Sequence, residues 1–302
     1  GVQTCALPIS ENKKERVRTE NIFFLFLKSA IKRRKMYRSP IASGSFYPGN
    51  KEELEGALKA LMEDCPQRQK ALGVISPHAG YLYSGRVMGS VFSRIEVPDT
   101  VVILAPNHTG LGTPFSVWPE GSWRTPLGDV SIDKELVSEI LNRCKLLEKD
   151  EAAHQNEHSA EVILPFLQYR NPQVKIVVIV VRSGNFEDLS TVGKSIGDAL
   201  NKIRPDTLVV ASSDMTHYES QQSADKKDKS AIAEIVALRE EGLYRVVREQ
   251  DISMCGVSPV ISMMVCSKER DAAKAELIKY ETSGEASGDY KQVVGYAGII
   301  VE

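Results

Sequence analysis

Short apolar runs alternate with longer stretches of helical periodicity from about residue 36 to the end of the chain. The apolar runs are rich in valine and isoleucine, which is typical of strands buried on both faces, and the alternation predicts helices on both faces of a central sheet. Strands are expected at Leu72–Ser76, Thr100–Ala105, Phe115–Trp118, Val174–Val181, Thr207–Ala211, Ala275–Glu281 and Val293–Val301. Helices are expected at Lys51–Met62, Gly85–Arg94, Asp133–Arg143, Ser159–Tyr169, Glu187–Lys202, Asp225–Arg239 and Pro259–Ser267. We therefore predict an α/β fold with a mostly parallel or mixed sheet.

The pattern runs without an internal repeat, a proline-rich linker or a low-complexity tract, so one domain is expected over residues 36–302. Residues 1–35 differ, because they carry a charge run from Glu11 to Arg18 and a basic stretch just before Met36. We interpret them as a disordered arm or a gene-start artefact. A targeting peptide is the alternative, which the acidic residues of this arm disfavour.

Composition narrows the class of protein. Of the 302 residues, 42% are hydrophobic and 26% charged, as in ordinary globular proteins. A balance of 38 basic against 40 acidic residues gives no field that would attract nucleic acid or a membrane surface. The apolar run Ile22–Leu27 is much shorter than the roughly 20 residues of a membrane-spanning helix. Five cysteines without a CxxC pair favour a reducing, cytoplasmic location over a disulfide framework.

The histidines fall at informative positions. His78, His108 and His217 each follow a predicted strand, at the edge where open α/β sheets bind ligands. Around His78 and His108 the order is the same, with the strand followed by proline, histidine and glycine. Because their strands are neighbours in sequence, we expect them to be neighbours in space, so that both imidazoles ligate one metal ion. A single loop histidine is more often a surface residue, but the repetition favours function.

Another polar cluster precedes the predicted helix at Ser159. Ser159 is a good N-cap, which would place His154 and His158 in the preceding loop rather than at helical spacing. Glu157 and His158 then become candidates for lining a pocket, with a solvated polar loop as the alternative.

Two further candidates lie later in the chain. Asp214 stands three residues before His217 and could orient it or raise its basicity, although a simple capping turn at Ser212 is the alternative. Cys255 precedes an apolar helix whose positive end would favour a thiolate. A buried structural cysteine is the commoner fate of a lone cysteine.

With these motifs assembled, the chain resembles the MEMO family, whose bacterial and archaeal members are called AmmeMemoRadiSam system protein B. The resemblance covers Met36–Glu302. Its segments are Pro40-Ile41-Ala42-Ser43-Gly44-Ser45-Phe46-Tyr47-Pro48, Pro77-His78-Ala79-Gly80-Tyr81, Pro106-Asn107-His108, Glu157-His158-Ser159, Ser212-Ser213-Asp214-Met215-Thr216-His217-Tyr218 and Cys255-Gly256.

The resemblance implies a fold similar to LigB-type class III extradiol dioxygenases, which hold Fe(II) with two histidines and a carboxylate. It implies that His78 and His108 are metal ligands, that Cys255 stands where the dioxygenases have a glutamate, and that His217 is the acid/base histidine, with Asp214 beside it. A thiolate shifts metal preference toward copper or zinc, so iron, copper and zinc are all expected candidates. The motif residues expected in the pocket or behind the ligands are Tyr81, Asn107, Glu157, His158 and Tyr218.

Three functions follow as hypotheses. The first is a metal-dependent redox protein, oxidase-like, that uses iron or copper at the two-histidine, one-cysteine site. The second is a non-catalytic module that recognises a small molecule, a peptide or a partner protein in the former dioxygenase pocket, and the resemblance implies radical-SAM and AMMECR-type proteins as partners. Five aromatic residues near the motifs could line such a groove or belong to the core, and we favour the core for them. These residues are Tyr81, Tyr83, Trp118, Trp123 and Tyr218. The third is a cysteine hydrolase with Cys255 as nucleophile and His217 or His158 as base, which leaves His78 and His108 without a role.

Overall fold

The computed structural model describes residues 37–182 and 184–302, so the interpretation of residues 1–35 lies outside the described part of the chain. Within that part, twelve strands form one mixed sheet in the order β1-β5-β6-β8-β3-β9-β2-β12-β10, with β4, β7 and β11 paired off this path. The strands are β1 Tyr37–Arg38, β2 Gly73–Ser76, β3 Thr100–Pro106, β4 Phe115–Val117, β5 Ser122–Thr125, β6 Gly128–Ile132, β7 Glu148–Lys149, β8 Lys175–Val181, β9 Leu208–Ser212, β10 His217–Glu219, β11 Ala275–Thr282 and β12 Val293–Val301.

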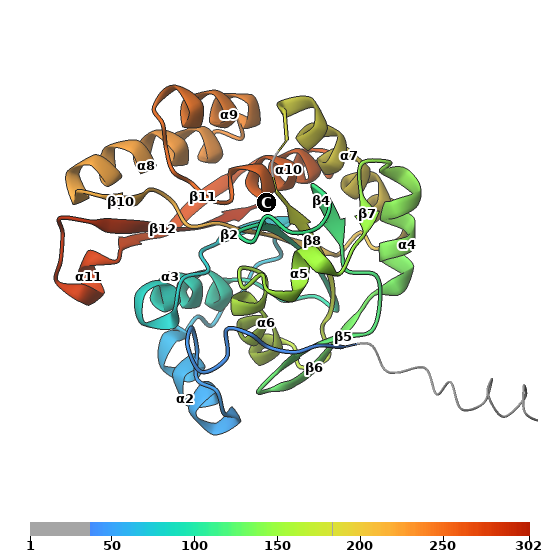
Figure 1. Cartoon of the computed structure of the whole chain (residues 1–302), viewed down its shortest axis with the longest axis horizontal. Helices are drawn as coiled ribbons and strands as arrows, with labels where there is room; N and C mark the ends of the chain where they lie inside the picture. Colours follow the sequence, from blue (N-terminus) through green and yellow to red (C-terminus); the bar gives the residue numbers. More distant parts are fainter. Residues whose placement is uncertain (1–36, 183) are drawn as a thin grey trace, which may run out of the picture. The chain divides into compact units, whose positions relative to one another are not determined.

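Helices cover both faces of this sheet, as the sequence predicts. In Figure 1, α7, α8, α9 and α10 lie above the strands and α2, α3 and α6 lie below them. The helices are α2 Lys51–Leu61, α3 Tyr81–Arg94, α4 Lys134–Arg143, α5 Ala152–Gln155, the 3-10 turn η1 Glu161–Ile163, α6 Leu164–Arg170, α7 Phe186–Ile203, α8 Gln221–Val236, α9 Glu240–Glu249, α10 Val257–Lys268 and α11 Gly284–Ser287. Among the described residues, none of these helices is both long enough and apolar enough to cross a membrane.

The parallel centre of the sheet holds the core and sets the direction of the site. Strands β6, β8, β3, β9 and β2 run parallel, and β12 adds to β2 antiparallel. The strand residues of β3, β8 and β9 are buried almost throughout, which explains their continuous valine and isoleucine runs. The carboxyl ends of five neighbouring strands therefore meet along one edge.

The seven strands expected from the sequence are present, each with ends within one residue of the prediction. The elements missed are short or weakly apolar, such as the β5–β6 hairpin, β10 and the helix α9. One spatial expectation is wrong: β2 and β3 are not neighbours, because β9 pairs with both and lies between them. Chain order does not decide which parallel strand is inserted between two others.

Candidate metal centre

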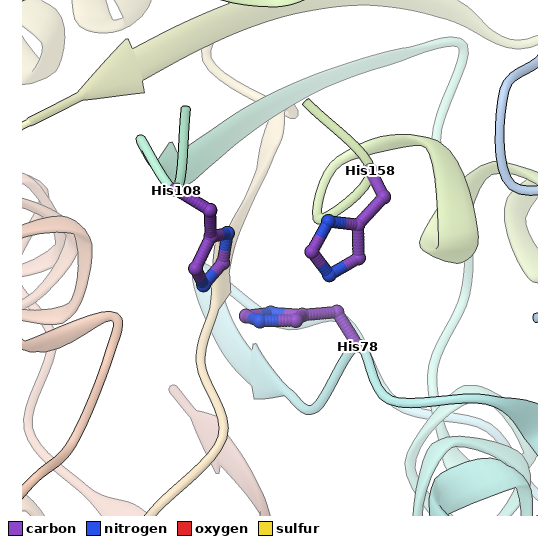
Figure 2. A group of neighbouring side chains, drawn as sticks. All are labelled: His78, His108 and His158. Atoms are coloured by element: carbon purple, nitrogen blue, oxygen red, sulfur yellow. The ribbon is translucent and has the colours of Figure 1, made fainter. Parts of the chain in front are cut away.

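Three histidines meet at the carboxyl edge of the sheet. His78 follows β2, His108 follows β3, and His158 lies in the loop between α5 and η1. Figure 2 shows their rings directed toward a common space from three separate segments. The ring centroid of His78 lies 5.2 Å from that of His108 and 5.5 Å from that of His158. The rings of His108 and His158 stack with their centroids 4.9 Å apart.

The spacing of their nitrogens suits a metal ion. One nitrogen from each ring lies within 4.8 Å of the other two. Metal–imidazole bonds of about 2.1 Å limit two nitrogens on one ion to about 4.2 Å apart, so small rotations of the rings would bring all three onto one ion. Imidazole is a good ligand for iron, copper and zinc alike, so the donor set fits the metals expected from the sequence without choosing among them.

His78 is held in a fixed orientation. Its Nδ1 lies 2.7 Å from the Ser212 hydroxyl at the end of β9, which leaves Nε2 for the cluster. Its backbone N–H donates to the Asp214 carboxylate. Burial lowers the pKa of His78 well below its ordinary value, and the neighbouring His108 and His158 add to this effect. The ring is therefore neutral and able to act as a ligand.

Glu157 organises the other two rings from behind. Its fully buried carboxylate accepts hydrogen bonds from His108 Nδ1 at 2.9 Å, from the His108 backbone and from both the backbone and hydroxyl of Ser159, and lies 3.5 Å from His158 Nδ1. Burial alone would raise the pKa of Glu157, but its bond to His108 and the backbone donors lower it to about 2. A buried carboxylate behind a ligand histidine fixes the tautomer and raises the basicity of the ring.

The histidines respond differently to this carboxylate. Burial favours the neutral form of His108, but the hydrogen bond and charge of Glu157 raise its pKa above the ordinary value. The pKa of His158 is lowered, chiefly by burial.

The Ser159 prediction is wrong in its detail. The next turn, η1, has Ala160 before its first residue, and the Ser159 side chain donates to Glu157 instead of capping a helix. His154 is also not in a loop but in the short helix α5. Ser159 donates to Glu157 because a buried carboxylate needs hydrogen-bond donors, and this outweighs the preference of serine for capping a helix. The burial of Glu157 arises only in the folded chain.

Cys255 lies beside His78 rather than among the three histidines. Its sulfur is 3.4 Å from His78 Nε2 and accepts a hydrogen bond from the Asp214 backbone. Gly256 permits this approach, because a Cβ there would lie 2.2 Å from the Ser212 carbonyl oxygen. The helix α10 does follow directly, but burial, together with the charge of Asp214, raises the pKa of the Cys255 thiol. The prediction of a helix-stabilised thiolate is therefore wrong, which also disfavours Cys255 as the nucleophile of a cysteine hydrolase.

Asp214 and His217 do not form the predicted pair. The Asp214 carboxylate accepts from the His78 backbone and lies 4.0 Å from His78 Nε2. His217 is oriented by Ser253, whose carbonyl is 2.9 Å from His217 Nδ1 and whose hydroxyl accepts from the His217 backbone. Sequence reasoning missed Ser253 and the role of Ser212, since a serine in a loop or at a strand end gives no signal of its partner in the folded chain.

A cavity of about 750 Å³ opens over the cluster. His78, His108 and His158 line it together with Asp214 and His217. Its other walls are formed by Phe46, Tyr83, Tyr218, Tyr296 and the segment around α11. Tyr218 has a φ of 57°, a left-handed conformation that is costly for an aromatic residue and often marks a functional site.

The remaining motif residues lie around this cavity or below it. Tyr81 begins α3 and is buried, with its hydroxyl donating to the Val162 carbonyl. Asn107 builds the turn that carries His108, by accepting from the backbones of Thr109 and Gly110. Trp118 and Trp123 are core residues, as favoured from the sequence, whereas Tyr83 and Tyr218 line the cavity.

Comparison with known proteins places the chain among close relatives. The family model of Memo-like proteins matches residues 38–300. A MEMO1 family protein of Methanopyrus kandleri is 42% identical over 279 residues, which cover 88% of this chain and 99% of that protein. A MEMO1 family protein of Aquifex aeolicus is 43% identical over 265 residues, covering 87% and 98%.

Likeness to solved structures is weaker. An uncharacterised protein of Escherichia coli K12 aligns with a TM-score of 0.47 at 10% identity, covering 76% of this chain and 98% of that one. The relation to extradiol dioxygenases stays a prediction.

Proposed function

The chain belongs to the family of Memo-like proteins, and on this premise we propose that it is a metal-binding redox protein, oxidase-like, with iron or copper as its native metal. The observation that carries this proposal is the convergence of three imidazoles beneath a cavity of about 750 Å³. A bound ion would supply electron exchange and Lewis acidity to a small molecule in that cavity. The cysteines of the described residues carry free thiols, which supports a cytoplasmic protein.

We assign His78 and His108 as two ligands and propose two candidates for the third, His158 and Cys255. His158 completes the cluster of nitrogens. Cys255 Sγ lies 3.4 Å from His78 Nε2. Bonds of about 2.1 Å to nitrogen and about 2.3 Å to sulfur would separate two such ligands by roughly 3.5 Å on a tetrahedral ion. The separation of His78 and Cys255 therefore matches that of two ligands on one ion, whereas His158 is close to both His78 and His108.

His217 is proposed as the proton-handling residue. Its Nδ1 faces the Ser253 carbonyl, which can only accept, so Nδ1 carries the proton in the neutral ring. Nε2 is then free to accept a proton from a molecule in the cavity that His217 lines. Asp214, buried beside His78, supports the ligand side of the site.

Dioxygen consumption tests this function. The protein loaded anaerobically with Fe²⁺ or with copper is expected to consume dioxygen with a reducing small molecule, and the metal-free protein is not. His217→Gln is expected to keep its metal but to lose about 100-fold or more in rate, the usual contribution of a general acid or base. Equal rates with and without metal would reject the oxidase proposal, and equal rates in the His217 variant would reject only the role of His217.

A second candidate function is a non-catalytic binding module. Two aromatic residues of the cavity wall favour it, because Tyr218 is 73% exposed and Tyr83 is 40% exposed. Exposed tyrosines of this kind often anchor peptides or proteins at interfaces. Radical-SAM and AMMECR-type proteins are proposed as partners on the basis of the family name alone.

Binding in the absence of metal tests the module. A purified AMMECR-type or radical-SAM protein from the same source is expected to bind the chelator-treated chain, and Tyr218→Ala is expected to weaken this binding by about 10-fold or more, as for a contact worth over 1 kcal/mol. The matched control is Tyr290→Ala, since Tyr290 is 50% exposed but is not part of the cavity wall. Equal binding by both variants, or none by the unmodified chain, would contradict a module at this cavity.

A further inference from the structure

The segment from Arg38 to Tyr47, here called the anchor segment, is far from the histidines in sequence but contacts the loop that carries His158. Arg38 is 3% exposed. Its guanidinium donates to the carbonyls of His154 and Glu157, at 2.6 Å each. The two carbonyls lie at the beginning and the end of residues 154–157, which lead directly into His158.

Glu161, which follows His158 in the sequence, also binds the anchor segment. Its carboxylate is fully buried and pairs with Arg38 at 2.5 Å. It also accepts the backbone N–H groups of Ile41 and Ala42 and the Tyr47 hydroxyl. One buried carboxylate thus ties both ends of the anchor segment to the residues just after His158.

Phe46 extends the anchor segment into the cavity. Its ring lies 4.7 Å from the ring of His158 and forms part of the cavity wall. Its carbonyl accepts the backbone N–H of Tyr81 at the start of α3, the helix that follows the His78 turn. The segment therefore touches the loop of His158 and the turn of His78 at the same time.

We infer that the anchor segment is part of the metal centre, and that Arg38, Glu161 and Phe46 are positioning residues that set the place of His158 and of the Glu157 carboxylate. The inference rests on the proposed metal site. The hydrogen bonds give the anchor segment a role in addition to packing. Arg38 donates to the backbone carbonyl of Glu157, and the Glu157 side chain orients the rings of His108 and His158. A displacement at Arg38 is therefore passed to two rings at once.

Co²⁺ binding tests this inference, because Co²⁺ reports both affinity and ligand geometry through its absorption bands. Arg38→Lys keeps the positive charge beside Glu161, but an ammonium cannot reproduce the planar fork that reaches both carbonyls. We expect it to bind Co²⁺ about 10- to 100-fold more weakly than the unmodified protein, as for loss of a residue behind a metal ligand, with altered absorption bands. Phe46→Leu, which leaves the Arg38–Glu161 pair intact, is expected to change the bands and to weaken binding to a smaller extent.

The control is Arg204→Lys, which alters a half-buried arginine paired with the buried Asp133 near the amino end of β3, away from the histidines. It is expected to leave Co²⁺ affinity and bands unchanged, even where its melting temperature falls as much as that of Arg38→Lys. Should Arg38→Lys fail to fold, Tyr47→Phe, which removes one hydroxyl from Glu161, and Phe46→Leu decide the question. Folded variants with the affinity and spectrum of the unmodified protein would overturn the inference. Absence of Co²⁺ binding by the unmodified protein would instead overturn the proposed metal site.

Discussion

His78→Ala is expected to lose stoichiometric metal binding. His78 lies near every other candidate ligand, since its ring is close to those of His108 and His158 and its Nε2 lies 3.4 Å from the Cys255 sulfur. Four-ligand zinc sites bind with about 10–16 kcal/mol, so one ligand supplies about 2.5–4 kcal/mol, equivalent to about a 70- to 900-fold loss of affinity. Metal content by mass spectrometry after anaerobic purification measures this loss.

Matched variants separate ligands from neighbours. His217→Ala removes an imidazole from the same cavity but not from the cluster, and is expected to keep its metal. Comparison of His158→Ala with Cys255→Ser then identifies the third ligand, because only the variant of the true ligand should approach the loss seen for His78→Ala. Full metal occupancy in His78→Ala would contradict the site.

Glu157→Ala is expected to have the second large effect, on both folding and metal affinity. The variant leaves the part-buried donors of His108 and the buried donors of Ser159 without their acceptor. A buried donor that is left without its acceptor costs about 1–3 kcal/mol in free energy of unfolding, and Ser159 has two such donors. The loss of a carboxylate behind a ligand histidine adds about a 10- to 100-fold decrease in metal affinity. Chemical denaturation and metal titration measure the two effects separately.

Because the pKa of Glu157 is lowered in the folded protein, we expect the free energy of unfolding to depend on pH. The pKa of Glu157 falls from an ordinary 4.5 to about 2 in the folded protein, so its contribution is present above pH 4.5 and is lost as pH falls toward 2. This shift corresponds to about 3 kcal/mol. Glu157→Gln keeps one acceptor oxygen but cannot titrate, so its unfolding free energy should depend less on pH between 4.5 and 2. A pH dependence equal to that of the unmodified protein would show that Glu157 is not the group responsible.

The sequence by itself determined the strands and the edge at which the chemistry gathers. Runs of valine and isoleucine can be buried on both faces only in a covered sheet, so they fixed the ends of β3, β8 and β9 to within one residue. Because ligands bind at the carboxyl ends of such strands, the positions of His78 and His108 already indicated a shared site. The residues of the sequence motifs also indicated the relationship to the Memo-like family, which the family model confirms.

Only the tertiary structure decided which side chains meet there. The insertion of β9 between β2 and β3 brings Ser212 to His78, and this strand order depends on pairings between distant segments that leave no local pattern. The same holds for Glu157, which the sequence placed in a pocket but whose buried charge recruits His108, His158 and Ser159. A buried carboxylate must find donors wherever the fold supplies them, so its partners are set by three-dimensional packing rather than by spacing along the chain.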